Sequence, residues 1–142
     1  MKNKFTGTVK AEIKADTSKV WDALTKPELI KQYFFGTNAV SDWKVGSPLY
    51  FRGTWEGKSY EDKGTILKSE PGKVFKYSYW SSMSGIEDKP ENYVEVTYQL
   101  AAKGDKTELT IIQENIPSDE MRTHSEKNWG MVVDGLKKLV EK

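Results

Sequence analysis

The sequence predicts an α+β fold in which a bent antiparallel sheet packs against one long C-terminal helix. Apolar and polar residues alternate with a period of two at the start of the chain and again between about residues 38 and 116. This alternation indicates antiparallel strands with one face in water. After Pro117 the apolar residues recur every three or four positions, which indicates an amphipathic helix.

The first strand is expected at the N-terminus, followed by a short helix. One face of this strand is apolar and the other is polar. Asp16 can cap a helix whose apolar stripe is formed by Val20, Trp21 and Leu24. The apolar strand residues are Phe5, Val9, Ala11 and Ile13.

A second short helix is predicted directly after the first. Thr25 and Glu28 have the spacing of a capping box around Pro27, a residue favoured in the first helical turn. The helix would run through Leu29, Ile30 and Phe34. We expect Gly36 to end it.

The middle of the chain predicts a meander of strands joined by tight turns. Turn-forming sequences occur at residues 45–47, 56–58, 70–73 and 103–106. Between these turns, alternate residues form apolar faces. These faces contain Phe75, Tyr77 and Tyr79, then Val94, Val96, Tyr98 and Leu100, and finally Leu109, Ile111 and Gln113.

The last segment predicts a helix from about Ser118 to Glu141. Ser118 can cap it, and Asp119 and Glu120 suit its positive N-terminal end. Lysines gather at the other end, where cations are favoured. The apolar stripe comprises Met121, Ser125, Trp129, Val132, Val133, Leu136, Leu139 and Val140.

Composition narrows the class of protein. The 142 residues suit one domain, 1–142, and 22 basic against 21 acidic side chains leave a net charge of +1. A nucleic-acid binder normally shows a clustered positive excess, so we expect no nucleic-acid partner. The absence of cysteine, of an apolar signal segment and of a long apolar run predicts a cytoplasmic protein without membrane insertion.

The sequence predicts no catalytic residues, no metal and no cofactor. His124 is the single histidine, so paired-histidine metal sites are excluded, and neither a GxSxG elbow nor a phosphate-binding glycine loop occurs. The adjacent carboxylates Glu61 and Asp62 would point to opposite faces of a strand. A second pair, Glu87 and Asp88, falls in a predicted solvated loop. We therefore expect a binding protein.

Five segments in order resemble the SRPBCC superfamily, also called START-like or birch-pollen-allergen-like. They are VWDALTKPELIKQYFFG (20–36), GTILKSEPGKVFKYSYW (64–80), VEVTYQL (94–100), TELTIIQEN (107–115) and EKNWGMVVDGLKKLVEK (126–142). The strongest likeness is to the subfamily named for the C-terminal domain of the Hsp90 ATPase activator. The resemblance implies a helix-grip fold, with a sheet of about six or seven strands around the last helix. Many relatives have a histidine near the position of Gln113, which disfavours acid–base chemistry here.

The leading functional hypothesis is binding of a small hydrophobic or amphipathic ligand in an internal cavity. We expect a cavity on the order of 300–1,000 Å³ and a flat, mostly apolar, uncharged ligand. Tyrosine hydroxyls, an amide and an indole aimed inward would need partners, which a ligand or water supplies. The predicted lining is Phe75, Tyr77, Tyr79, Val96, Tyr98, Ile111, Gln113, Trp129 and Val133.

Two alternatives remain open. The resemblance implies a co-chaperone-type protein binder acting in the stress response, with a chaperone as partner. Such a site would expose an apolar surface patch, for which Phe34, Phe35, Trp43 and Trp55 are candidates. A cyclase or dehydratase-type enzyme is the less favoured alternative. A close-packed interior would favour the surface binder over the ligand binder.

Overall fold

The computed structural model describes residues 5–34, 36–55, 57–81 and 87–141. It contains seven strands, three α-helices and one short 3₁₀ helix within these ranges. In chain order the elements are β1 (Phe5–Ile13), α1 (Thr17–Thr25), α2 (Pro27–Tyr33), β2 (Asn38–Ser41), β3 (Pro48–Trp55), β4 (Lys58–Glu70), β5 (Val74–Tyr79), η1 (Pro90–Asn92), β6 (Val94–Lys103), β7 (Lys106–Ile116) and α3 (Asp119–Val140).

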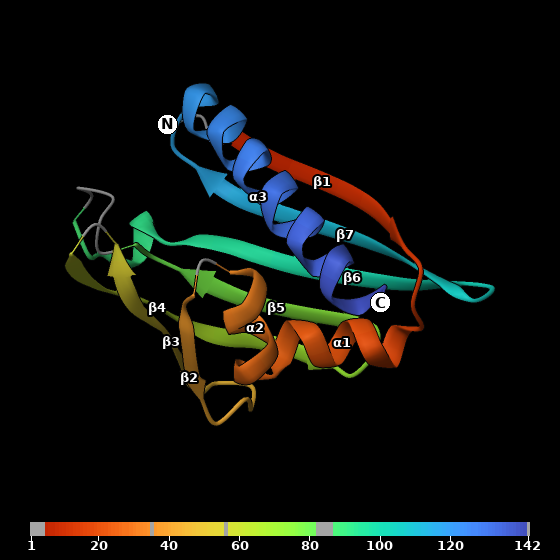
Figure 1. Ribbon diagram of the computed structural model, residues 1–142. Helices are drawn as coiled ribbons and strands as arrows, with labels where there is room; N and C mark the ends of the chain where they lie inside the picture. Colours follow the sequence, from red (N-terminus) through yellow and green to blue (C-terminus); the bar gives the residue numbers. More distant parts are fainter. Residues whose placement is uncertain (1–4, 35, 56, 82–86, 142) are drawn as a thin grey trace.

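All seven strands form one antiparallel sheet in the order β1-β7-β6-β5-β4-β3-β2. The sheet bends, and the three helices lie on one of its faces, α3 across β1 and β7, with α1 and α2 near the end where α3 finishes (Figure 1). The predicted fold class is confirmed. The strand count agrees with the six or seven strands that the resemblance implied.

The two short helices begin where the sequence predicts, but the second is capped differently. The Asp16 side chain accepts a hydrogen bond from the backbone N–H of Lys19, as expected of an N-cap. The predicted capping box is wrong: Thr25 belongs to α1 and donates its hydroxyl to the Trp21 carbonyl, while Lys26 is the N-cap of α2. The helix ends at Tyr33, before Gly36 is reached.

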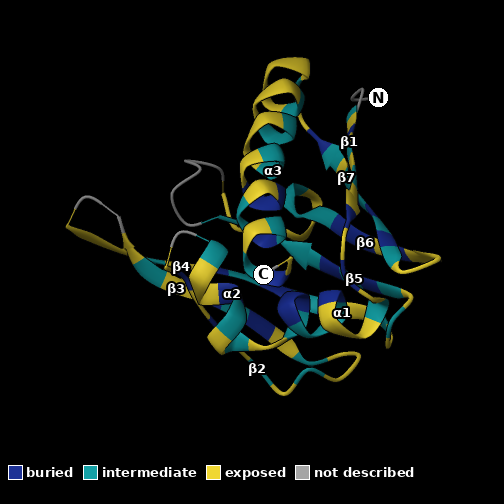
Figure 2. Cartoon of the chain, turned by 45° about the vertical axis from the view of Figure 1, so that its right-hand side comes forward, coloured by how far each residue is buried: buried dark blue, intermediate teal, exposed yellow. Residues whose placement is uncertain are grey.

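Helix α3 starts at its predicted cap, where the Ser118 hydroxyl accepts from the Met121 N–H. Its buried residues are Val132, Val133, Leu136 and Val140, which all lie in the C-terminal half. Figure 2 shows the same asymmetry, with the N-terminal turns of α3 mostly exposed or half-buried. Met121, predicted on the apolar stripe, is 40% exposed because this end of the helix extends past the packed core.

Candidate functional site

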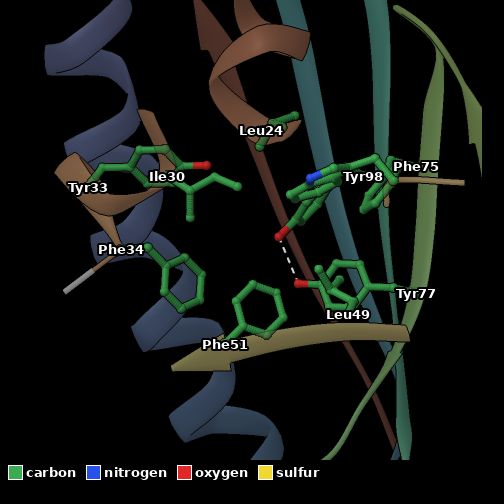
Figure 3. A pocket seen from close by; sticks show the side chains of 10 residues that line it. Leu24, Ile30, Tyr33, Phe34, Leu49, Phe51, Phe75, Tyr77 and Tyr98 are labelled. Carbon is green, nitrogen blue, oxygen red and sulfur yellow. Dashed lines mark hydrogen bonds between the residues drawn. The ribbon is translucent and has the colours of Figure 1, made fainter. Parts of the chain in front are cut away.

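Aromatic rings from the sheet and from the segment around α2 point toward one another between the sheet and the helices (Figure 3). The void among these side chains has a volume of about 10 Å³, room for no more than about one water molecule. This volume is far below the predicted value of about 300–1,000 Å³, so these side chains do not enclose a cavity of the predicted size. The void is lined by Leu24, Ile30, Tyr33, Phe34, Trp43, Leu49, Phe51, Phe75, Tyr77 and Tyr98.

Ring-to-ring contacts explain the closed interior. Phe34, which follows α2, stacks on Phe51 of β3 with their centroids 5.9 Å apart. Phe75 stacks on Tyr98 at 6.2 Å, and Tyr77 meets Phe51 at 5.8 Å. Rings from α2, β3, β5 and β6 thus interdigitate at ordinary packing distances. The large side chains that were expected to line a cavity instead occupy most of its space.

Most polar tips of these aromatic side chains find partners within the protein. The Trp129 indole N–H donates to Gln113 Oε1 at 2.7 Å, and the Ser125 hydroxyl donates to the same oxygen at 2.7 Å. The Tyr79 hydroxyl donates to the Asp62 carboxylate. The expectation that these groups need a ligand or a water cluster is therefore wrong for Trp129, Gln113 and Tyr79.

The Tyr77 and Tyr98 hydroxyls are bonded to each other, with their oxygens 2.8 Å apart. Figure 3 shows this bond between two rings that point into the interior from neighbouring strands. Burial raises the pKa of both phenols, so both are protonated. One bond uses one of the two hydroxyl protons. No described residue accepts the second proton, which leaves one buried donor available.

The predicted lining residues divide into three groups. Phe75, Tyr77 and Tyr98 do line the residual void. Tyr79, Gln113 and Trp129 are half-buried and are not among its lining residues, although the Trp129 ring contacts the Tyr98 ring with centroids 5.9 Å apart. The remaining three, Val96, Ile111 and Val133, belong to the buried core.

Sequence reasoning missed the contribution of the short helices and of β3. Leu24, Ile30, Tyr33, Leu49 and Phe51 line the void, although only the sheet centre and α3 were expected to do so. Phe51 alternates with polar neighbours on its strand, a pattern that could have identified it. The inward direction of α1 and α2 depends on tertiary packing, which the sequence pattern does not specify.

Two of the four candidates for an exposed apolar patch pack against the core instead. Phe34 and Trp43 are half-buried and pack against the core, Phe34 on Phe51 and Trp43 on Phe75. Phe35 and the side chain of Trp55 lie outside the described residues.

A larger hollow lies on the opposite, outer face of the sheet. It is an open groove of about 520 Å³. Its strand residues alternate with buried inward residues, for example Ser78 with Tyr77, so they point away from the helices. The lining residues are Tyr50, Lys63, Gly64, Thr65, Leu67, Ser78, Asp88, Pro90, Tyr93, Glu95 and Asn115.

One wall of the outer groove is fixed by a polar cluster. Asp88 receives Lys63 Nζ at 2.6 Å and the Tyr93 hydroxyl at 2.7 Å. The bonds from Lys63 and then Tyr93 lower the pKa of the Asp88 carboxyl, so it is charged at neutral pH. Asn115, in a left-handed conformation with φ +67°, donates to the Tyr93 carbonyl at 2.8 Å. These bonds attach the segment before β6 to the sheet.

The described ranges contain no group of three or more His, Cys, Asp or Glu side chains that could hold a metal ion. His124 is exposed on α3. No described helix is both long and apolar enough to cross a membrane.

Comparisons with known proteins agree with this architecture. ChR145 from Cytophaga hutchinsonii has a solution structure with 45% identity and a TM-score of 0.86, over 99% of this chain and 97% of that one. The Aha1 dimer from Colwellia psychrerythraea has 20% identity and a TM-score of 0.74, over 96% of each chain. Ara h 8.0201 has 11% identity and a TM-score of 0.78, over 97% of this chain and 98% of that one, and shares the fold.

No curated protein sequence matches the chain. A sequence model of one family, described as activator of Hsp90 ATPase homolog 1-like protein, matches residues 14–141. That match spans almost the whole chain and all three helices. The chain belongs to the family of proteins similar to activator of Hsp90 ATPase homolog 1.

Proposed function

We propose that this chain acts by binding another protein, that the outer groove is its docking surface, and that the partner is an Hsp90-type chaperone. The observation that supports surface binding is the contrast between a void of about 10 Å³ inside and a groove of about 520 Å³ outside. The family name supports the choice of partner. The cytoplasm, expected from the sequence, is where the two proteins would meet.

The groove has the mixed chemistry of a protein interface. Tyr50 and Leu67 offer apolar contact, and Leu67 is 41% exposed. Val40 faces Tyr50 across the β2–β3 pair and is 44% exposed, so it extends the apolar surface to the edge of the sheet. The Arg52 guanidinium lies 5.0 Å from the centre of the Tyr50 ring. Tyrosine and arginine are enriched at protein interfaces and among their energetic hot spots.

The test measures binding to a purified Hsp90-type ATPase by isothermal titration calorimetry, together with its ATPase rate. Tyr50→Ala and Leu67→Ser each remove apolar contact area from the groove. We expect each change to weaken binding at least about tenfold, the loss of one hot-spot contact. Val45→Ser is the matched control, because Val45 is 60% exposed but does not line the groove.

The result that supports the proposal is weaker binding in both groove variants with unchanged binding in the Val45 variant. Loss of binding in all three variants would place the contact elsewhere. No binding and no change in ATPase rate for the unmodified chain would refute the chaperone as partner. Circular dichroism of each variant checks that the fold is kept.

A second candidate function is binding of a small ligand in the interior, once opened. It is favoured by the Tyr77–Tyr98 pair, which leaves one buried O–H donor without an acceptor among described residues. Such a donor costs about 1–3 kcal/mol, which a ligand acceptor would recover. Native mass spectrometry of protein purified without detergent tests this candidate. A co-purifying molecule of constant mass supports it, and bare protein alone contradicts a tightly bound resident ligand.

A further inference from the structure

Trp43 adopts a backbone conformation that a tryptophan rarely takes. Its φ is +64°, in the left-handed region where a bulky side chain is an outlier. Such conformations persist only where surrounding contacts enforce them. Here the Ser41 hydroxyl accepts a hydrogen bond from the backbone N–H of Trp43 at 3.0 Å and donates one to the Pro48 carbonyl at 2.8 Å. The connection between β2 and β3 is thereby closed around Trp43.

The indole is the group that this conformation puts into place. It contacts the Phe75 ring at 6.1 Å and lines the residual void together with Tyr77 and Tyr98. The Trp43 side chain is only half-buried, so one edge of the ring system reaches the surface. The indole therefore closes the interior from outside.

We propose that Trp43 is a built-in occupant of a binding site for a flat, uncharged aromatic molecule, and that its departure admits such a ligand. This inference rests on the second candidate function. The ligand would take the place of the indole against Phe75. An acceptor atom of the ligand would receive the spare proton of the Tyr77–Tyr98 pair.

The lining determines the class of ligand. None of the ten residues around the void is Lys, Arg, Asp, Glu or His, so a charged ligand would lose its hydration without gaining a partner. Six of the lining side chains besides Trp43 are aromatic and favour a planar molecule. The spare hydroxyl proton favours a ring nitrogen or a carbonyl oxygen. A fused two-ring heteroaromatic has this shape and chemistry.

The position of Trp43 in the fold allows it to move without unfolding the sheet. It follows β2, a four-residue strand at the edge of the sheet whose one neighbouring strand is β3. Beyond Trp43, two backbone hydrogen bonds hold the connection to Ile66. The Gly46 N–H donates to the Ile66 carbonyl at 2.8 Å, and the Ile66 N–H donates to the Ser47 carbonyl at 3.0 Å. Short edge segments with few bonds open at lower free energy than central strands.

The test uses quinoline as the probe, an uncharged fused two-ring molecule with one acceptor nitrogen, and measures its Kd by NMR titration at pH 8. Trp43→Ala removes the built-in occupant and should lower the Kd at least about tenfold, because the apparent affinity of a closed site scales with its open fraction. If Trp43→Ala does not fold, Trp43→Leu serves instead.

Trp21→Ala is the matched control. The Trp21 indole also contacts Phe75, at 6.0 Å and edge-on, but Trp21 lies in α1 and does not line the void. Its removal should not tighten quinoline binding. Naphthalene, which has the same shape without the acceptor, separates shape from hydrogen bonding. In a chain with Trp43→Ala, adding Tyr77→Phe and Tyr98→Phe should weaken quinoline binding at least about threefold and leave naphthalene binding unchanged.

The outcomes distinguish the role of Trp43 from the existence of the binding site. Equal quinoline Kd values for the unmodified chain and Trp43→Ala would overturn the role of Trp43 while leaving interior ligand binding standing. No quinoline binding to either Trp43 variant would overturn the site itself, and the second candidate function with it. Equal tightening by Trp21→Ala would reduce the effect to general loosening of the core, which also overturns the inference.

Discussion

Removing the Tyr77 and Tyr98 hydroxyls, singly and together, tests whether their bond stabilises the core. Phenylalanine at either position keeps the ring and its packing, so a change in the free energy of unfolding reports on the hydroxyl alone. The oxygens are 2.8 Å apart, and the two residues are 2% and 6% exposed. A buried bond of this length is a full-strength neutral hydrogen bond.

The expected magnitudes differ sharply between the single and double variants. Each single change breaks the bond and leaves the other hydroxyl without a partner, which should lower the free energy of unfolding by about 1–2 kcal/mol. The double variant leaves no hydroxyl without its partner, and it also removes the donor that has no acceptor among the described residues. Its stability should therefore lie within about 1 kcal/mol of the unmodified chain. If the double variant is as stable as the unmodified chain, the coupling between the two positions is about 2–4 kcal/mol, the sum of the two single costs.

Urea unfolding followed by circular dichroism measures these four free energies. Tyr93→Phe serves as the control, because its hydroxyl bonds an exposed carboxylate at 2.7 Å and should contribute little. Additive single effects, with a double variant destabilised by their sum, would refute the interpretation. That result would mean that each hydroxyl has its own partner and that no spare donor exists for a ligand.

Four further predictions concern the core, the backbone and the surface. Trp129→Ala should lower the free energy of unfolding, measured in urea, by about 2–4 kcal/mol. This is below the roughly 3–5 kcal/mol of a fully buried tryptophan, because Trp129 is half-buried. A loss under about 1 kcal/mol would contradict its packing role. Gly64→Ala should lower the free energy of unfolding by at least about 2 kcal/mol, since the new Cβ would overlap the Ser78 carbonyl oxygen. The Cβ added by Gly130→Ala in α3 meets nothing within 4 Å, so this change should stabilise the fold by about 0.5–1 kcal/mol. His124→Ala should change thermal stability by less than about 0.5 kcal/mol, as an exposed side chain. Stability should fall above about pH 10, because the unfolded chain then ionises its tyrosines while burial keeps the pKa of Tyr77 higher in the fold. Unchanged stability between about pH 9 and pH 11 would contradict this.

The fold was predictable because local patterns and tertiary structure agree. Period-two alternation in β5, β6 and β7 matches the buried face of the sheet, and the period of the last helix matches α3 to within one residue at each end. Asp16 and Ser118 both cap helices as predicted. The cap of α2 was not predictable, because Thr25 satisfied its hydroxyl inside α1 and was therefore not available to the next helix.

The site was only partly predictable. The alternation of residues along a strand shows which face each side chain points to, but not how much space remains between the sheet and the helices. It placed Phe75, Tyr77 and Tyr98 on the inner face correctly. It could not show how far α2 approaches that face, which is decided by the contact between Phe34 and Phe51. Trp43 was a candidate for an exposed apolar patch, because no sequence rule expects a tryptophan with positive φ to turn its ring inward.

The closed interior and the open groove follow from the same strand alternation. Every ring that β5 and β6 direct inward leaves a small or polar neighbour on the outer face, as Ser78 lies between Tyr77 and Tyr79. Large inner side chains therefore fill the concave side while the outer face keeps room between its strands and the segment held by Asp88. Enlarging the interior by trimming Phe51 or Trp43 would change the inner face without touching the groove. The two proposed binding modes can therefore be tested independently, one face at a time.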